Sequence, residues 1–516
     1  MCTIGPPTAT KEGIEMLAAA GMNVARFNMS HGDHAWHQSV IDLVDAYNRD
    51  HPEAMIGKLL DTKGPEVRSG DVKKPLDLVP GATLVFDCAD GATHDGSEGV
   101  VGVNYDDFIN DVDVSDVILV DGGLMTMRVD EKDNANSLVK CTIIEGGKMG
   151  SRRHLNVRGR SASLPSLTDK DWDDIKFGVR NNVDFFALSF VKDAEVVHTL
   201  RAWLKTQGAN TQIMPKIESA DSVQNLEEIL RASDGCMVAR GDLGAELPVE
   251  QVPFWQSAIV QGLRRLGKPV IVATNMLESM IENPTPTRAE VSDISIAVRE
   301  GTDAVMLSGE TAYGKYPARA VNVMATVAQR TEHAMSQEVG SRRNGSQESY
   351  PITWIQQTDP NAETSVSEMF AFHATTMANT LGCPILVFSR YGNMPALLSH
   401  YRPDHHIFAF CDREDVTRRL SLYNGVRASI FTLGEDPDET IDRALRDLVD
   451  RGELAPSDRI CVVRGGRRPL WRSNATHAIQ VRAAVVDGSA GIGFGAMEDP
   501  ALKYASVLEG PHDEAY

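Results

Sequence analysis

The sequence lacks the marks of a disulfide-stabilised, membrane-spanning or nucleic-acid-binding protein. Its seven cysteines are an odd number with no CxxC pair, so neither a disulfide framework nor a zinc site is indicated, and a reducing compartment fits best. No apolar run approaches the roughly 18 residues needed to span a bilayer. Positive charge is scarce, since 51 Lys and Arg face 72 Asp and Glu, and the net charge of −21 disfavours nucleic acid and anionic membranes as partners. An anionic substrate would therefore need cations and metal ions gathered at one site.

The length and the first residues bear on domain organisation. A chain of 516 residues is long enough for two to four domains, each with its own core. Residues Met1 to Pro7 read as the tail of a strand followed by a turn. We therefore expect a truncated N-terminus, so the absence of a targeting peptide is uninformative.

Most of the chain alternates short apolar runs with amphipathic helical segments, which predicts an α/β fold. Eight of the runs are expected to form a (β/α)8 TIM barrel from residues 1–67 and 165–336. A helix expected over Asp169–Asn181 would turn Lys170, Asp173 and Asp174 outward. The eight expected strands are Met1–Gly5, Asn23–Asn28, Ala54–Leu60, Asp184–Phe190, Gln212–Met214, Cys236–Ala239, Pro269–Ala273 and Ala304–Leu307.

Two other segments break this rhythm. Residues 68–164 contain short apolar runs between Gly, Asp and Asn turns and no convincing helix, so we expect an inserted all-β domain that sits over the barrel rim as a lid. Residues 337–516 are expected to form a C-terminal α/β domain with strands at Ile385–Ser389, His406–Phe410, Ala428–Phe431 and Arg459–Val463. A polar linker over residues 336–361 would precede that domain, and the tail from about residue 487 would be disordered.

The stretch from Gln212 to Gly244 is the most informative. It reads as strand, helix, strand, with Lys216 and Glu218 at the end of the first strand and Asp242 at the end of the second. In a (β/α)8 barrel such ends converge on one rim, where active sites are built. One lysine and two carboxylates there suit a divalent metal beside a fixed cation, as in phosphoryl transfer. The alternative is three surface charges in ordinary connecting loops.

Other polar residues also follow expected barrel strands. Glu218 and Asp242 can supply two carboxylate oxygens to Mg²⁺, which keeps waters and substrate oxygens as its other ligands. His34 and His37 are read as the start of a helix without a carboxylate or thiol partner rather than as metal ligands. Three further groups would share the rim: an oxygen cage suited to a large monovalent cation (Asn28, Ser30, Asp61, Thr62), cations for phosphate (Arg26, Arg68, Lys216) and the hydroxyl of Thr274.

Several long motifs identify a family. CTIGP, NVARFNMSHG, LLDTKGPEVRSG, PKIES, MVARGDLGAELP, ATNMLESM, RAEVSD and MLSGETAYGKYP occur in this order and closely resemble pyruvate kinase. The likeness runs from Met1 to about Ala484, and its variants are most like plastid isozymes of plants and algae. It implies transfer of a phosphoryl group from phosphoenolpyruvate to ADP, giving pyruvate and ATP, with Mg²⁺ (or Mn²⁺) and K⁺.

The resemblance also implies residue roles. Glu218 and Asp242 would bind Mg²⁺, and Glu66 matches the family members that require K⁺. In the family a lysine of the inserted domain reaches the nucleotide, and Arg153 stands at that position here. The remaining implied roles are K⁺ binding (Asn28, Ser30, Asp61, Thr62), substrate binding and catalysis (Arg26, Lys216, Gly241, Asp242, Thr274) and nucleotide binding (Asn28, Ser30, His31, Arg68, Arg153).

The resemblance further implies a homo- or hetero-tetramer and a plastid stroma location, with the cytoplasm as the alternative. Residues Ser389 to Pro395 keep few of the hydroxyls found in members activated by fructose 1,6-bisphosphate, so we expect little or no response to that sugar. The run Arg464–Arg468 could bind another anion or be solvated surface charge. Two other classes remain open: a regulatory subunit with feeble catalysis, which would show a damaged rim, and a metal-dependent lyase, which would not need the lid.

Overall fold

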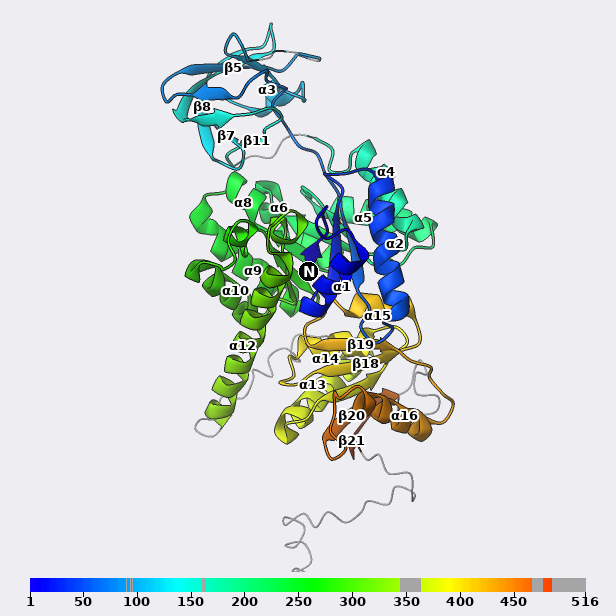
Figure 1. Cartoon of the computed structure of the whole chain (residues 1–516). Helices are drawn as coiled ribbons and strands as arrows, with labels where there is room; N and C mark the ends of the chain where they lie inside the picture. The colour runs from blue at the N-terminus through cyan, green and yellow to red at the C-terminus, as the bar shows by residue number, and fades with distance from the viewer. Residues whose placement is uncertain are drawn as a thin grey trace, which may run out of the picture.

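The computed structural model places a barrel between an inserted β domain at one end and a C-terminal α/β domain at the other (Figure 1). It describes residues 1–484 except residues 90, 93, 95, 160–163, 344–362 and 466–476. The expected disordered tail and most of the expected linker therefore lie outside the described residues. Every helix that the structure describes is either too short or too polar to span a bilayer.

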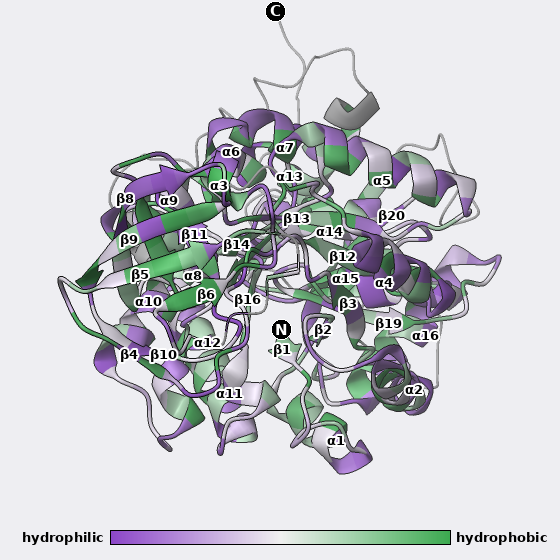
Figure 2. Cartoon of the chain, turned by 90° about the horizontal axis from the view of Figure 1, so that it is seen from above, coloured by the Kyte–Doolittle hydropathy of each residue, from purple (hydrophilic) through white to green (hydrophobic). Residues whose placement is uncertain are grey.

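Eight parallel strands form the barrel that the sequence predicts. Their order is β1-β2-β3-β12-β13-β14-β15-β16, and the ring closes where Cys2 pairs in parallel with Leu307. Figure 2 looks down on this ring from the side of the inserted domain. The strands are β1 (Cys2–Thr3), β2 (Val24–Asn28), β3 (Gly57–Asp61), β12 (Phe185–Leu188), β13 (Gln212–Ile217), β14 (Cys236–Ala239), β15 (Val270–Ala273) and β16 (Ala304–Val305).

The barrel strands are apolar on both faces because both faces are covered. Inward side chains such as Leu59, Phe185 and Met237 form one buried cluster, which Leu422 of the C-terminal domain joins. The outward side chains pack against the surrounding helices in a second cluster. The C-terminal domain thus closes one mouth of the barrel, and the other mouth, at the carboxyl ends of the strands, faces the insertion.

Six of the described barrel helices begin at a residue whose side chain caps the first turn. Thr168 and Thr287 each accept a hydrogen bond from the backbone three residues on, and the side chains of Asp171 and Glu290 reciprocate. The helices are α1 (Lys11–Ala20), α2 (His34–Asp50), α4 (Asp169–Arg180), α5 (Ala194–Thr206), α6 (Ala220–Gln224), α7 (Leu226–Ala232), α8 (Arg240–Glu246), α9 (Val252–Arg265), α10 (Arg288–Glu300), α11 (Gly309–Ala312) and α12 (Pro317–Arg343). The six capped helices are α1, α2, α4, α5, α6 and α10. Residues 336–343, expected to begin a linker, instead complete α12.

The inserted domain consists of a six-stranded sheet, β11-β7-β8-β9-β5-β6, and a two-stranded sheet, β10-β4. The expectation that it holds no helix is wrong, because Phe108–Asp111 forms the one-turn helix α3. One turn is too short to show helical periodicity, and burial of Phe108 and Ile109 holds it in place. The strands are β4 (Leu76–Leu78), β5 (Thr83–Asp87), β6 (Val100–Gly102), β7 (Val117–Val120), β8 (Met125–Asp133), β9 (Leu138–Glu145), β10 (Gly147–Met149) and β11 (Leu155–Val157).

The C-terminal domain has a five-stranded sheet of order β19-β18-β17-β20-β21. Four strands match the expectation, and β21 (His477–Ala483) adds an antiparallel edge strand that was not foreseen. The possible anion-binding run Arg464–Arg468 starts in β20 and continues outside the described residues. The other elements are α13 (Glu363–Leu381), β17 (Ile385–Phe388), α14 (Asn393–His400), β18 (Ile407–Cys411), α15 (Glu414–Leu420), β19 (Val426–Ile430), α16 (Pro437–Asp450) and β20 (Arg459–Gly465).

A buried ion pair joins the C-terminal domain to the barrel. Arg418 Nε lies 3.2 Å and 3.1 Å from the two carboxylate oxygens of Asp184, which is 3% exposed. The backbone N–H of Lys58 donates to the same carboxylate at 2.8 Å. Burial raises the pKa of Asp184 even though Arg418 opposes that rise, so the carboxylate depends on its partner.

Arg418→Met should lower the free energy of unfolding by about 3 kcal/mol, because it leaves the buried Asp184 carboxylate without a counter-charge. Urea denaturation followed by circular dichroism measures the change. Arg427→Met is the control, since Arg427 pairs with Glu453 at an exposed site and should cost less than about 1 kcal/mol. Equal midpoints for the two variants would contradict this account of the interface.

Candidate active site

The residues singled out by the sequence lie at the carboxyl ends of five barrel strands. Asn28 and Asp61 end β2 and β3 and are paired in register. Glu218 directly follows β13, and Gly241 and Thr274 lie just beyond β14 and β15. Because the strands are parallel, all of these ends open on one rim.

Lys216 is at the centre of an ionic cluster on this rim. Its Nζ lies 3.2 Å from Asp61 Oδ1 and 3.4 Å from Glu218 Oε2. Arg26 Nε donates to Asp61 Oδ2 at 2.7 Å, and its Nη1 donates to Thr3 Oγ1 at 2.8 Å. The side chains of Asp61 and Glu218 are 1% and 0% exposed, so these charges interact with little screening.

The charges in the cluster set one another's protonation. Burial works against the ammonium of Lys216, but Asp61, Glu218 and Asp242 outweigh it and raise the pKa of Lys216 above its ordinary value. Burial also opposes ionisation of Asp61, yet Lys216 and Arg26 hold the pKa of Asp61 below its ordinary value. For Glu218 burial prevails and raises the pKa, with Lys216 offsetting only part of the rise. The cluster thus has a cation that stays charged, Lys216, beside the carboxylate of Glu218. A further positive charge nearby would stabilise the ionised form of Glu218.

Glu218 and Asp242 fit a divalent cation. Glu218 Oε1 accepts the backbone N–H of Phe190 at 2.6 Å, whereas its buried Oε2 has no hydrogen-bond donor of suitable geometry among the described residues. The side chain of Asp242 is 38% exposed and close enough for its charge to raise the pKa of Glu218. Within the described chain no three His, Cys, Asp or Glu side chains gather at a metal site. Two carboxylates are enough for Mg²⁺, which keeps several waters.

The oxygens suited to a monovalent cation lie at the ends of β2 and β3, which are separated from β13 by β12. Asp61 Oδ1 is buried and, although near Lys216, receives no well-aligned hydrogen bond in the part of the chain that is described. Asn28 Oδ1 accepts the backbone N–H of Ser30 at 3.1 Å, which turns the loop after β2. The carbonyl of Thr62 accepts the hydroxyl of Ser189 at 2.5 Å. These neutral oxygens beside one carboxylate fit K⁺ better than a smaller, doubly charged ion.

Thr274 is held in a strained conformation. Its φ of +68° is in the left-handed region, which a β-branched residue rarely adopts. Its hydroxyl accepts the backbone N–H of Gly241 at 2.7 Å and donates to the Ala273 carbonyl at the same distance. Arg240 secures the turn by donating to the carbonyl of Thr274 at 2.6 Å and pairing with Asp293 at 2.6 Å and 2.7 Å.

The residues expected to contact the nucleotide are less closely grouped. Arg68 donates two hydrogen bonds to Glu66, at 2.8 Å and 2.9 Å, so its guanidinium is already paired. Arg153 is also occupied, since its Nη1 donates to Asp121 of the insertion at 2.9 Å. It is the next residue, His154, that lies 3.9 Å from Asp242. Ser30 and His31 follow Asn28 in the loop after β2, and His31 is exposed to solvent.

Two comparisons with known proteins bear on this geometry. A family model described as "Pyruvate kinase, barrel domain" matches residues 1–321, and one described as "Pyruvate kinase, alpha/beta domain" matches residues 368–480. The chain belongs to the pyruvate kinase family. Membership in the pyruvate kinase family implies phosphoenolpyruvate and ADP as substrates and, in general, a divalent metal ion and K⁺.

Curated relatives agree with this assignment. Plastidial pyruvate kinase 3, chloroplastic, of Arabidopsis thaliana is 54% identical over 95% of this chain and 82% of its own. Pyruvate kinase isozyme G, chloroplastic, of Nicotiana tabacum is 54% identical over 93% of this chain and 82% of its own. Plastidial pyruvate kinase 2 of Arabidopsis thaliana is 54% identical over 93% and 80%, respectively.

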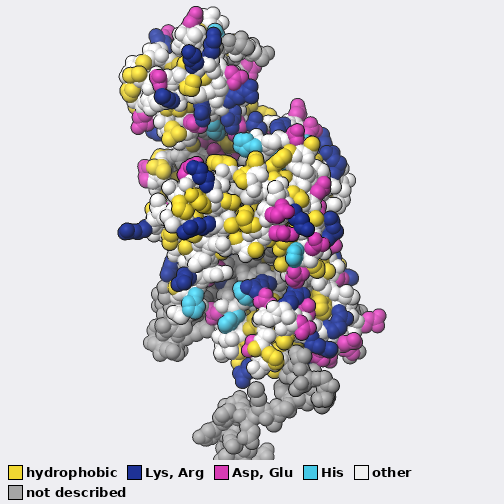
Figure 3. All heavy atoms as spheres, in the orientation of Figure 1, with side chains coloured by type: hydrophobic (Ala, Val, Ile, Leu, Met, Phe, Trp, Pro, Cys, Tyr) yellow, Lys and Arg dark blue, Asp and Glu magenta, His cyan; other side chains and the backbone are white. Residues whose placement is uncertain are grey.

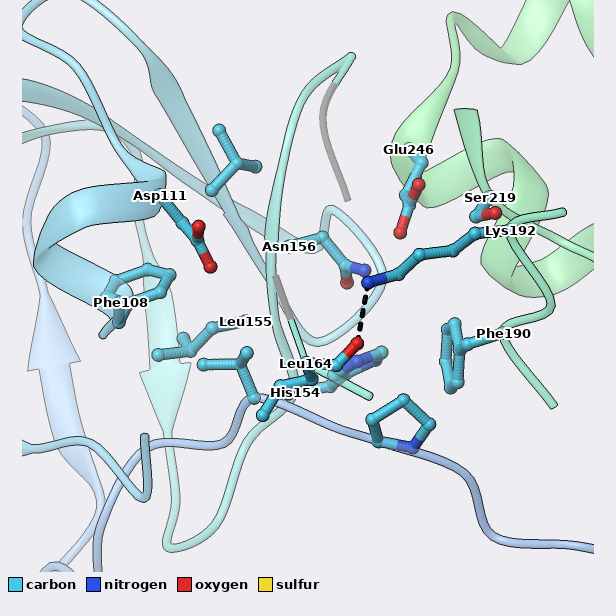
Figure 4. Close-up of a pocket in the computed structure, with 13 residues that line it drawn as sticks. Phe108, Asp111, His154, Leu155, Asn156, Leu164, Phe190, Lys192, Ser219 and Glu246 are labelled. Carbon is cyan, nitrogen blue, oxygen red and sulfur yellow. Dashed lines mark hydrogen bonds between the residues drawn. The ribbon is translucent and has the colours of Figure 1, made fainter. Parts of the chain in front are cut away.

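A small, partly open cavity of about 30 Å³ lies between the insertion and the barrel of this pyruvate kinase family member, at the waist visible in Figure 3. Lys192 Nζ donates to the Leu164 carbonyl across it at 2.7 Å, with Glu246 and Ser219 nearby (Figure 4). Among the described residues, its lining contains none of the expected site residues. The cavity is thus part of the joint between lid and barrel rather than the catalytic rim.

The sequence reading missed the contribution of two residues and misplaced a third. Arg240 was given no role in the expected site, and Phe190, with a φ of +51°, gave no signal that its backbone N–H would hold Glu218. Asp174, expected to point outward, is 1% exposed because it accepts bonds from Lys170 and His34. His34 therefore has the carboxylate partner that the sequence reading denied it.

Arg240→Lys should lower kcat by at least about tenfold, because a lysine cannot keep both the paired contact with Asp293 and the bond to the Thr274 carbonyl. Pyruvate formation measured by a coupled assay gives the rate. Arg265→Lys, an exposed change at the end of α9, should leave kcat unchanged. An Arg240→Lys enzyme as fast as this control would show that the turn at Thr274 does not need the guanidinium.

Proposed function

We propose that the rim of this barrel transfers the phosphoryl group of phosphoenolpyruvate to ADP, giving pyruvate and ATP in glycolysis. The observation that carries the proposal is the cluster of Lys216 with Asp61, Glu218 and Arg26, a set of fixed charges in a buried mouth of the barrel. Two polyanionic substrates repel each other, and fixed cations offset that repulsion while aligning donor and acceptor.

Arg26 and Lys216 are the groups proposed to hold the phosphate. Arg26 offers a planar fork for bidentate contact, and Lys216 supplies a point charge. Both are kept in place by Asp61, so neither must be reorganised when substrate arrives. Gly241, Asp242 and Thr274 complete the proposed substrate site, with the Gly241 N–H held by the Thr274 hydroxyl.

Glu218 and Asp242 are proposed to bind Mg²⁺ or Mn²⁺, and Asn28, Ser30, Asp61 and Thr62 are proposed to bind K⁺. When bound, these ions supply positive charge that neutralises phosphate oxygens. The buried Glu218 Oε2 and Asp61 Oδ1, which receive no well-aligned hydrogen bond from the described residues, support this assignment.

Lys216 is proposed to stabilise charge rather than to transfer a proton. Its raised pKa makes the ammonium a weak acid at neutral pH, so it holds the enolate of pyruvate without protonating it. Thr274, whose hydroxyl is fixed by its neighbours, is proposed to orient the proton donor toward carbon. The nucleotide-binding side of the site is proposed to be lined by Asn28, Ser30, His31, Arg68 and Arg153.

Lys216→Ala should lower kcat by at least about 10²-fold, because it removes the permanent cation opposite the developing charge. The coupled pyruvate assay, run with and without ADP, measures the effect and also separates kinase from lyase chemistry. Lys205→Ala, at an exposed position on α5, is the matched control and should retain full activity. A loss of only two- or threefold in Lys216→Ala would rule out the assigned role.

Replacing K⁺ by Na⁺ at constant ionic strength should reduce activity sharply, because the smaller ion fits the oxygen cage at Asn28 and Asp61 poorly. Steady-state rates in KCl, NaCl and tetramethylammonium chloride provide the measurement. Equal rates in all three salts would remove the proposed monovalent site.

The protein is placed in plastids, as the chloroplastic relatives suggest, and is proposed to form a homo- or hetero-tetramer. Exposed apolar side chains support self-association: Phe254 on α9 is 65% exposed and Ile296 on α10 is 52% exposed. Sedimentation velocity of the purified chain tests the assembly, and a monomer at micromolar concentration would contradict it.

Weak or no activation by fructose 1,6-bisphosphate remains a prediction from the residues after β17.

A further inference from the structure

The end of β2 and the loop after it, from Asn28 to His31, carry two of the four proposed K⁺ ligands and three of the five proposed nucleotide contacts, yet few bonds hold this loop to its own strand. Met29 N donates to the Asp61 carbonyl at 3.0 Å, and His31 N donates to the Asn28 carbonyl at 3.2 Å. The loop's outer carbonyls, Met29 O and His31 O, are instead bound by side chains from two helices. The position of Asn28 and Ser30 therefore depends on groups that are not part of the rim.

Lys170 of α4 holds the first of these carbonyls. Its Nζ donates to Met29 O at 2.9 Å and to Asp174 Oδ2 at 2.6 Å. Asp174 is 1% exposed, and its other oxygen lies 2.7 Å from His34 Nε2 of α2. The ring of His34 stacks on Phe177 with centroids 4.5 Å apart. The ammonium is thus aimed at the loop by a buried carboxylate that is itself fixed from two helices.

His37 of α2 holds the second carbonyl. Its Nε2 lies 2.8 Å from His31 O and must donate, because a carbonyl only accepts. Burial lowers the pKa of His37, so the ring is neutral and this tautomer is fixed by its bond. Lys170 and His37 together hold the loop on both sides of Ser30.

The same first turn of α4 also contacts the chain that leaves for the lid. Asp171 Oδ1 accepts the backbone N–H of Gly64 at 2.9 Å, while its Oδ2 is bound by Thr168. Gly64 has a φ of +72°, and a side chain there would come within 2.5 Å of Ser189 Cβ, so this arm passes close over the rim. Helix α4 is therefore a shared support for the lid arm and the loop.

We propose that Lys170 and Asp174 are positioning residues for monovalent cation and nucleotide binding. The inference rests on the proposed function only for the identity of the ligands. Lys170 donates to the Met29 carbonyl, and Asp174 keeps the ammonium directed at it. The loop then presents Asn28 and Ser30 to the cation without further ordering.

Helix α4 also carries an exposed surface ion pair, which serves as a comparison for the contacts of Lys170. Lys176 pairs with Asp173 at 3.1 Å, and both side chains are more than half exposed. Lys170 differs because its two bonds end on a loop carbonyl and on a carboxylate that is 1% exposed. Lys176 is thus a matched control on the same helix.

The test compares Lys170→Met, Asp174→Asn and the control Lys176→Met in the full chain. Hydrogen–deuterium exchange of residues 28–32 is the first readout, and it does not depend on activity. Exchange there should be at least about tenfold faster in both positioning variants and unchanged in Lys176→Met. Exchange of residues 270–273 in β15 should stay the same in all three, which separates a local effect from general unfolding.

The second readout is the KCl concentration that gives half-maximal rate at constant ionic strength. Groups that orient a metal ligand typically change affinity 10–100-fold, so this concentration should rise at least about tenfold in Lys170→Met and Asp174→Asn. The KM for phosphoenolpyruvate should change less than about twofold, because Arg26 and Lys216 are untouched. A merely structural role would shift both constants together.

Unchanged exchange at residues 28–32 in both positioning variants would overturn the proposal, as would equal effects of Lys176→Met. If the parent enzyme needs no K⁺, the cation assignment under the proposed function fails. Two measurements then still decide whether Lys170 and Asp174 position the loop: the exchange at residues 28–32, and the KM for ADP, which should rise in both positioning variants.

Discussion

The structure depends on one contact, the ammonium of Lys216 held between the carboxylates of Asp61 and Glu218 at the mouth of the barrel. Three buried charges of the same sign would be unfavourable there. Because the positive Lys216 lies between the negative carboxylates of Asp61 and Glu218, the chain can bury all three together. The arrangement requires that β3 and β13 end on the same rim, which parallel strands in a closed ring ensure. The fold thus gathers fixed charges of both signs at one mouth of the barrel.

The two flanking domains act on this rim in different ways. The C-terminal domain closes the opposite mouth with Leu422 and anchors itself through Arg418 and Asp184, so it fixes the base of the barrel. The insertion lies over the rim and brings His154 close to Asp242. Helix α4, which the chain enters on its return from the lid, contacts both the lid arm and the loop after β2. The lid arm and the loop that carries two of the proposed cation ligands therefore share one support.

Much of this could be predicted from sequence, because charged residues after short apolar runs indicate strand ends. Lys216, Glu218 and Asp61 were placed correctly on that ground, and eight apolar runs predicted the barrel. Contacts between distant segments leave no such local signal, so the exposure of Asp174 was predicted wrongly. The left-handed backbone of Phe190 and Thr274 was equally invisible, since neither residue type favours it. The edge strand β21 and the one-turn helix α3 were missed because tertiary packing, more than local periodicity, defines them.

Substrate charge is expected to be neutralised at one place, where Glu218 and Asp242 lie beside Lys216. Anomalous diffraction from crystals grown with Mn²⁺ tests this most directly, because the metal is located independently of the protein. The result expected is one strong manganese peak bonded to a carboxylate oxygen of Glu218 and one of Asp242. Manganese bound elsewhere, with those two carboxylates facing different cavities, would contradict the account.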